Sequence, residues 1–140
     1  MALSKEEREQ FLAEPHIGAL SVVERPDRAP LTVPIWYQYT PGGELWVRTP
    51  PDSRKARAID AAGRFSLLAQ RTEPTVRYVS VEGPVLRTDP PSDELARELA
   101  ARYLPPDKVA GYVEYEKQFG GHVTVYMRPE HWLSADLGSA

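Results

Sequence analysis

Cysteine is absent from the 140-residue sequence, which excludes disulfides, thiolate metal sites and a cysteine nucleophile. Long apolar runs are also absent: no stretch approaches the roughly 18 apolar residues of a membrane-spanning helix. The N-terminal MALSKEEREQ carries charges where a signal peptide needs an apolar run. We therefore expect a cytoplasmic protein that does not bind a membrane.

An excess of charge of one sign is missing as well. The 17 basic and 20 acidic residues give a net charge of −3, so no general attraction to nucleic acid is expected. The three histidines, His16, His122 and His131, are widely spaced, and we predict no metal site. Ser80 and Ser134 lack the surroundings of a hydrolase nucleophile.

The chain has the length of one domain, and we expect residues 1–140 to form one. Capping residues and apolar spacing predict helices from Ser4 to about Glu14, from Asp52 or Ser53 to Gly63, from Ser92 to Pro105, and from Lys108 to Gln118. Alternating or apolar runs predict strands His16–Val23, Leu31–Tyr39, Leu45–Thr49, Phe65–Ala69, Val76–Leu86 and His122–Met127. Because mostly short hairpins join these strands, an antiparallel barrel is favoured over a βαβ array.

The run Leu31–Tyr39 alternates strictly. Its odd positions are apolar or aromatic and predict a core face, whereas Trp36 lies on the opposite face. Trp46 in the next strand lies on that opposite face too. The two tryptophans indicate a covered outer surface, which gives weak support to a subunit interface.

The segment TPPDSRKAR ends one predicted strand and opens a helix. Unpaired N–H groups at a helix start, together with the Ser53 hydroxyl and the Arg54 and Lys55 cations, favour a phosphate or carboxylate site. Cations at that end oppose the helix dipole unless an anion binds. A solvated basic first turn is the alternative interpretation.

The runs TPPDSRKARAI, RFSLLAQ and RYVSVEGPV resemble the flavin-binding split-barrel superfamily that contains pyridoxamine 5′-phosphate oxidase. The upstream LSVVERPDRAPLTVPIWYQY fits as well, and the resemblance covers roughly residues 10 to 135. The short length and the PIWYQY and SRKARAI segments are most similar to the small deazaflavin reductases that use coenzyme F420. The implied fold is a mainly β, antiparallel, six-stranded split β-barrel with flanking helices.

The resemblance implies where the cofactor phosphate binds. Arg54 and Lys55 would hold the phosphate, with Ser53 and Thr49 as hydrogen-bond partners and Arg57 as a third cation.

It also implies where the cofactor ring lies. Pro34, Ile35 and Trp36 would run beside the ring, and Tyr78 would approach it from the neighbouring strand. Trp132 would pack near the cofactor of the partner subunit, or else anchor the tail of its own chain.

The function implied is that of a homodimeric oxidoreductase with the cofactor at the subunit interface. It would use F420 to pass a hydride to an unknown small-molecule acceptor, and no side chain is assigned a catalytic role because the cofactor supplies the chemistry. Two alternatives remain: an FMN-dependent enzyme of the pyridoxamine-phosphate-oxidase type, or a non-catalytic flavin- or tetrapyrrole-binding protein. The long N-terminal region and C-terminal arginine segment of pyridoxamine oxidase proper are not present, which argues against pyridoxal phosphate synthesis.

Overall fold

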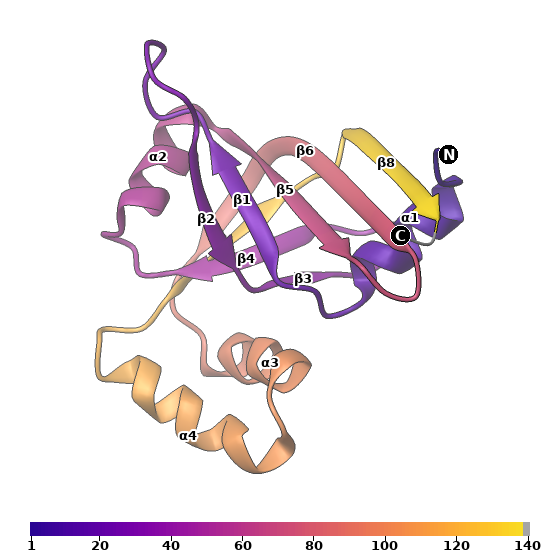
Figure 1. Ribbon diagram of the computed structural model, residues 1–140. Helices are drawn as coiled ribbons and strands as arrows, with labels where there is room; N and C mark the ends of the chain where they lie inside the picture. The colour runs from indigo at the N-terminus through magenta and orange to yellow at the C-terminus, as the bar shows by residue number, and fades with distance from the viewer. Residues whose placement is uncertain (139–140) are drawn as a thin grey trace.

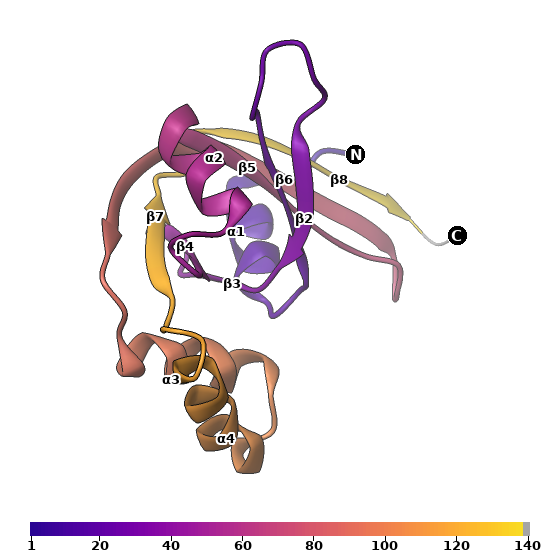
Figure 2. The ribbon, with the colours of Figure 1, turned by 90° about the vertical axis from the view of Figure 1, so that its left-hand side faces the viewer.

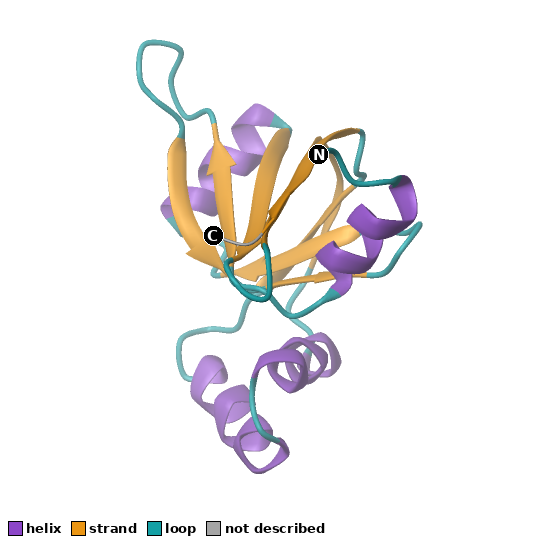
Figure 3. Ribbon diagram, turned by 45° about the vertical axis from the view of Figure 1, so that its right-hand side comes forward, coloured by secondary structure: helices purple, strands orange, loops and turns teal. Residues whose placement is uncertain are grey.

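The computed structural model describes residues 1–138, and all its strands belong to one antiparallel sheet with helices around it (Figures 1 and 3). The strands are β1 (Gly18–Val22), β2 (Leu31–Ile35), β3 (Tyr37–Tyr39), β4 (Leu45–Thr49), β5 (Arg64–Arg71), β6 (Val76–Asp89), β7 (Val123–Met127) and β8 (His131–Gly138). The helices are α1 (Lys5–Ala13), α2 (Arg54–Ala62), α3 (Asp93–Tyr103) and α4 (Pro106–Lys117). Within these residues no helix has both the length and the apolar character needed to cross a membrane.

The sheet curls back on itself because its two edges are neighbours in sequence. Its order is β2-β1-β5-β6-β7-β4-β3, and only Trp36 separates β2 from β3. Ile35 pairs with Gly18 of β1, whereas Tyr37 pairs with Val47 of β4 at the far edge. The predicted mainly β split barrel with flanking helices is confirmed.

Strand β6 is long enough to serve both halves of the curled sheet. Its first part pairs with β5 and β8, and its last part pairs with β7 after a register shift between Val85 and Arg87. Such an irregularity bends a strand and strengthens its twist. The bend carries the chain from one half of the barrel to the other.

The described chain has eight strands where six were predicted, and each extra strand has a physical reason. Trp36 interrupts the run Leu31–Tyr39, which therefore becomes β2 and β3. The tail forms β8, in which Leu133 and Leu137 are 65% and 63% exposed. Because these two leucines face outward and only Trp132 packs against the core, the sequence shows no run of core residues there.

The main core fills the curl and is closed by two helices. Phe11 and Leu12 of α1 and Ile59 of α2 belong to the same buried cluster as Leu67 of β5 and Val81 of β6. Local chemistry sets both helix starts. At α1 the predicted capping box is present with both of its hydrogen bonds, and Ser53 caps α2, which ends at a left-handed Gly63.

Helices α3 and α4 form a hairpin that projects from the barrel between β6 and β7 (Figure 2). Leu95, Leu99 and Tyr103 of α3 supply the apolar stripe that packs against Trp36 and Trp46. The face carrying the two tryptophans is thus covered by the chain's own helices. The interpretation of these tryptophans as support for a subunit interface was therefore wrong.

A glycine in β6 is required by a close backbone contact, which gives a test of this fold. A Cβ at Gly83 would lie 1.7 Å from the carbonyl oxygen of Arg128, so Gly83→Ala should lower the free energy of unfolding by more than about 2 kcal/mol. Gly111→Ala in α4 is the matched control, since its Cβ meets nothing within 4 Å. It should raise that free energy by roughly 0.5–1 kcal/mol. Urea unfolding measures both, and wild-type stability of Gly83→Ala would contradict the packing of β6.

Candidate functional site

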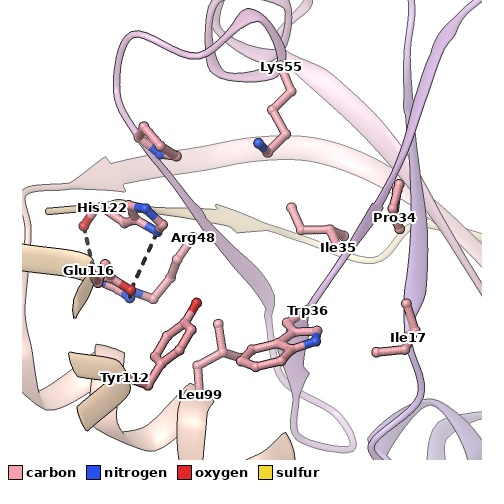
Figure 4. A pocket seen from close by; sticks show the side chains of 11 residues that line it. Ile17, Pro34, Ile35, Trp36, Arg48, Lys55, Leu99, Tyr112, Glu116 and His122 are labelled. Atoms are coloured by element: carbon pink, nitrogen blue, oxygen red, sulfur yellow. Dashed lines mark hydrogen bonds and ion pairs between the residues drawn. The ribbon is translucent and has the colours of Figure 1, made fainter. Parts of the chain in front are cut away.

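A pocket of about 330 Å³ lies between the barrel and the helical hairpin (Figure 4). The barrel contributes the end of β2, the end of β4 and the start of α2, and the hairpin contributes its inner side. The lining residues are Ile17, Pro34, Ile35, Trp36, Arg48, Pro50, Lys55, Leu99, Tyr112, Glu116 and His122. Four of the predicted cofactor residues are among them: Pro34, Ile35, Trp36 and Lys55.

Lys55 brings a positive charge into this pocket. Its side chain extends inward from the side opposite Tyr112 and Trp36 (Figure 4). Burial lowers the pKa of the Lys55 ammonium, and within residues 1–138 no carboxylate pairs with it. A half-buried cation without a counter-charge is stabilised when an anion binds beside it. The position of Lys55 at the start of α2 adds backbone N–H groups that lack helical partners.

The other predicted cations point elsewhere. The Arg54 guanidinium makes two hydrogen bonds to Glu24, Nε to Oε2 at 2.8 Å and Nη2 to Oε1 at 2.6 Å, and its side chain is 64% exposed. This pair lowers the pKa of the Glu24 carboxyl. The Arg57 guanidinium donates to the carbonyl of Asp52, just before its own helix. Arg54 could bind an anion in the pocket only if its hydrogen bonds to Glu24 were broken.

The two predicted hydroxyl groups are engaged with the chain itself. Thr49 is fully buried, and its Oγ1 lies 2.8 Å from Ser53 Oγ. Ser53 Oγ in turn accepts a hydrogen bond from the Ala56 N–H as the cap of α2. In this arrangement both hydroxyls fix the start of the helix, and neither lines the pocket.

The predicted ring-binding segment forms one wall of the pocket. Trp36 is stacked on Tyr103, with ring centroids 4.8 Å apart and an interplanar angle of 13°, and it also meets Tyr112 at 5.3 Å. Its neighbours Pro34 and Ile35 line the same wall. The wall is therefore flat, apolar and held by the hairpin.

Tyr78 and Trp132 lie outside this pocket. Tyr78 is half-buried on β6 and pairs with Gln70 of β5. Trp132 packs edge-on against Tyr39 at 6.1 Å, and the Arg8 guanidinium lies 4.5 Å from its ring. In its own chain Trp132 anchors the tail to the barrel; its predicted role near a partner's cofactor stays a prediction.

Sequence reasoning missed a buried ion pair at the hairpin side of the pocket. Arg48 Nη1 donates to Glu116 Oε2 at 2.8 Å, and the two side chains are only 2% and 5% exposed. Arg48 Nη2 donates to the carbonyls of His122 and Ser92, whereas Arg48 Nε has no acceptor within residues 1–138. The partners lie 68 positions apart in sequence, on a strand and on a charged helix, so no local pattern joins them.

His122 completes this group. Its Nδ1 lies 3.5 Å from Glu116 Oε2. Burial lowers the pKa of His122 below 6.5, Glu116 opposes this, and the charges of Arg48 and Lys55 add to the lowering. The imidazole is therefore neutral at pH 7, and Lys55 carries the net charge of the pocket because Arg48 and Glu116 cancel.

The chain belongs to the pyridoxamine 5′-phosphate oxidase family, whose sequence model matches residues 4–135. The resemblance to flavin-binding split barrels is thereby confirmed. No curated protein matches the sequence.

Solved structures share the fold. A structure named F420 reductase is 24% identical, with a TM-score of 0.70, over 89% of this chain and 94% of that chain. A conserved hypothetical protein from Mycobacterium tuberculosis is 25% identical, with a TM-score of 0.73, over 97% and 86%. An FAD-binding protein from Mesorhizobium loti is 20% identical, with a TM-score of 0.63, over 97% and 95%.

The electrostatics of the pocket predict the titration of His122. Its NMR-detected pKa should lie below 6.5, and Lys55→Ala should raise it because a neighbouring cation is removed. The exposed control Lys108→Ala should leave it unchanged. Since the folded state binds fewer protons than the unfolded state, the contribution of His122 to stability is present above pH 6.5 and lost as the pH falls through its folded pKa. A pKa at or above 6.5 would contradict the described surroundings.

Proposed function

We propose that this protein is an oxidoreductase that binds coenzyme F420 and passes a hydride from it to a small-molecule acceptor. The observation that carries the proposal is Lys55, a half-buried cation without a carboxylate partner in the described chain, which lines one pocket with Pro34, Ile35 and Trp36. A cofactor with an anionic tail and a flat ring matches both parts of that lining.

The residues fit such a cofactor in distinct roles. Lys55 and the N–H groups at the start of α2 would bind the phosphate. Arg54 would also bind the phosphate once its hydrogen bonds to Glu24 are broken. Ser53 and Thr49 would hold the helix start in place, and Arg57 would add positive charge nearby. When bound, F420 supplies the hydride, so the side chains need only bind, orient and exclude water.

The choice of F420 over other flavins is supported by the similarity to the solved structure named F420 reductase. FMN is the second candidate, because it also presents a phosphate and a flat ring, and an FAD-binding protein shares the fold. Titration of the purified protein with each cofactor, followed by cofactor fluorescence, separates the two. Tighter binding of FMN would move the chain to the oxidase-like branch of the family, and tight binding without acceptor-dependent oxidation of the reduced cofactor would indicate a carrier.

Removal of the two cations at the start of α2 should weaken cofactor binding. Arg54→Ala/Lys55→Ala should raise the Kd for F420 by more than about 100-fold, or roughly 3 kcal/mol, because charge-assisted hydrogen bonds to the phosphate are lost. The control Arg97→Ala/Lys108→Ala removes two exposed cations of the hairpin and should leave the Kd unchanged. Near-normal affinity of the Arg54→Ala/Lys55→Ala variant for F420 would contradict the assignment of the phosphate site to the start of α2.

We also propose a homodimer with the site at the subunit interface. One face of the sheet carries a row of directly paired residues across five strands: Pro34, Ala19, Leu68, Ser80 and Leu133. The row is uncharged, and a hollow of about 560 Å³ on this face shares Ile17 and Pro34 with the site pocket. A second copy seated there would reach the open side of the site, and its Tyr78, two residues from Ser80 on the same face, would be the residue to examine.

The dimer is tested by light scattering coupled to size exclusion at micromolar concentration. The wild-type chain should have twice the monomer mass. Leu68→Arg should give monomers, because a charge would be buried in the centre of the face. Val23→Arg, at an exposed loop position, should remain dimeric. A monomeric wild-type protein would refute the interface.

A further inference from the structure

A second hollow of about 320 Å³ adjoins the site pocket at the end of α4. It shares Pro50, Tyr112, Glu116 and His122 with the site pocket, and its own walls are Tyr115 and Phe119. We refer to the hollow between Pro50, Tyr115 and Phe119 as the aromatic annex. The shared residues make the annex a continuation of the site.

The annex is lined by large apolar side chains that the chain leaves uncovered. Tyr115 and Phe119 are 60% and 63% exposed, and their rings meet edge to face with centroids 5.1 Å apart. Aromatic side chains grouped in an open hollow are typical of surfaces that bind an apolar ligand. The carboxylate of Glu116 belongs to Arg48, so no unpaired charge faces the annex from it.

A hydrogen-bond donor stands where the annex meets the site pocket. Tyr112 lines both, and within residues 1–138 its hydroxyl makes no hydrogen bond. Burial raises the pKa of the Tyr112 hydroxyl, which therefore keeps its proton. Because the nearby Arg48 is already neutralised by Glu116, this junction favours an uncharged oxygen acceptor over a second anion.

We propose that the annex binds the apolar part of a flat, uncharged acceptor molecule, while the carbonyl oxygen of that molecule accepts a hydrogen bond from the Tyr112 hydroxyl. The inference rests on the proposed function only in identifying this occupant as the hydride acceptor. The cofactor and the acceptor would then bind in different parts of one continuous site. Lys55 holds the anionic cofactor, and the helical hairpin selects an amphipathic acceptor.

The first test removes the annex while keeping the site pocket. Isothermal titration with 2-acetylnaphthalene, a flat ketone, should give a Kd at least tenfold higher for Tyr115→Ser/Phe119→Ser than for the wild-type chain. The matched control Val23→Ser/Leu137→Ser changes two similarly exposed apolar residues outside both hollows and should shift the Kd less than twofold. An unchanged Kd in the annex variant would overturn the proposal.

The second test addresses the donor. The wild-type chain should bind 2-acetylnaphthalene at least tenfold more tightly than 2-ethylnaphthalene, which lacks the oxygen. Tyr112→Phe keeps the aromatic ring and removes only the hydroxyl, so it should abolish the preference for the ketone. A preference retained in the folded Tyr112→Phe variant would contradict the assigned donor.

The last comparison separates this inference from the proposed function. With saturating F420 present, the Kd for the ketone should change less than threefold, because cofactor and acceptor occupy different parts of the site. A tenfold increase would mean that the annex belongs to the cofactor site, and the proposal would fall. If F420 does not bind at all, the proposed function fails, whereas the ketone titrations still decide the annex.

Discussion

Arg48 and Glu116 join the barrel to the helical hairpin through a buried ion pair with a 2.8 Å contact. Both charges have left water, so each depends on the other: removing one would leave the second buried and unpaired, at a cost of roughly 3–5 kcal/mol. The pair holds the end of β4 beside the end of α4. The pocket lies between these two elements, and its shape depends on this contact.

A second set of contacts fixes the pocket wall that contains Trp36. The Tyr103 hydroxyl lies 2.7 Å from the His16 carbonyl and 3.1 Å from that of Tyr37, and it accepts from the Tyr37 N–H at 3.2 Å. These bonds satisfy the backbone where Trp36 interrupts the sheet. The neighbouring Arg102 donates to the last carbonyls of α1, at Ala13 and Glu14. One turn of α3 thereby ties the strand break, the first helix and the pocket wall together.

Features encoded by local chemistry could be predicted from the sequence. The cap at Ser53, the stop at Gly63 and the alternation around Tyr37 each depend on a few neighbouring residues. The position of Lys55 followed from the start of α2. The directions of the Arg54 and Arg57 side chains could not be predicted. A long side chain can pair with any of several groups, and only the folded chain brings partners such as Glu24 close to it.

The hairpin shows the limit of local reasoning. Its helices were predicted from their apolar spacing, but their covering of Trp36 and Trp46 depends on how the chain returns to the barrel. The group formed by Arg48, Glu116 and His122 unites a strand, a helix and a loop, so only the tertiary fold reveals it. The same holds for β8, in which Leu133 and Leu137 face away from the core and only Trp132 packs against it.

The proposed function requires that the cofactor's anionic group binds at Lys55, in the pocket between barrel and hairpin. A crystal structure of the protein with F420 tests it most directly. We expect the phosphate within hydrogen-bonding distance of Lys55 Nζ and the ring against Pro34, Ile35 and Trp36. A cofactor bound elsewhere, with Lys55 left without a ligand, would contradict it.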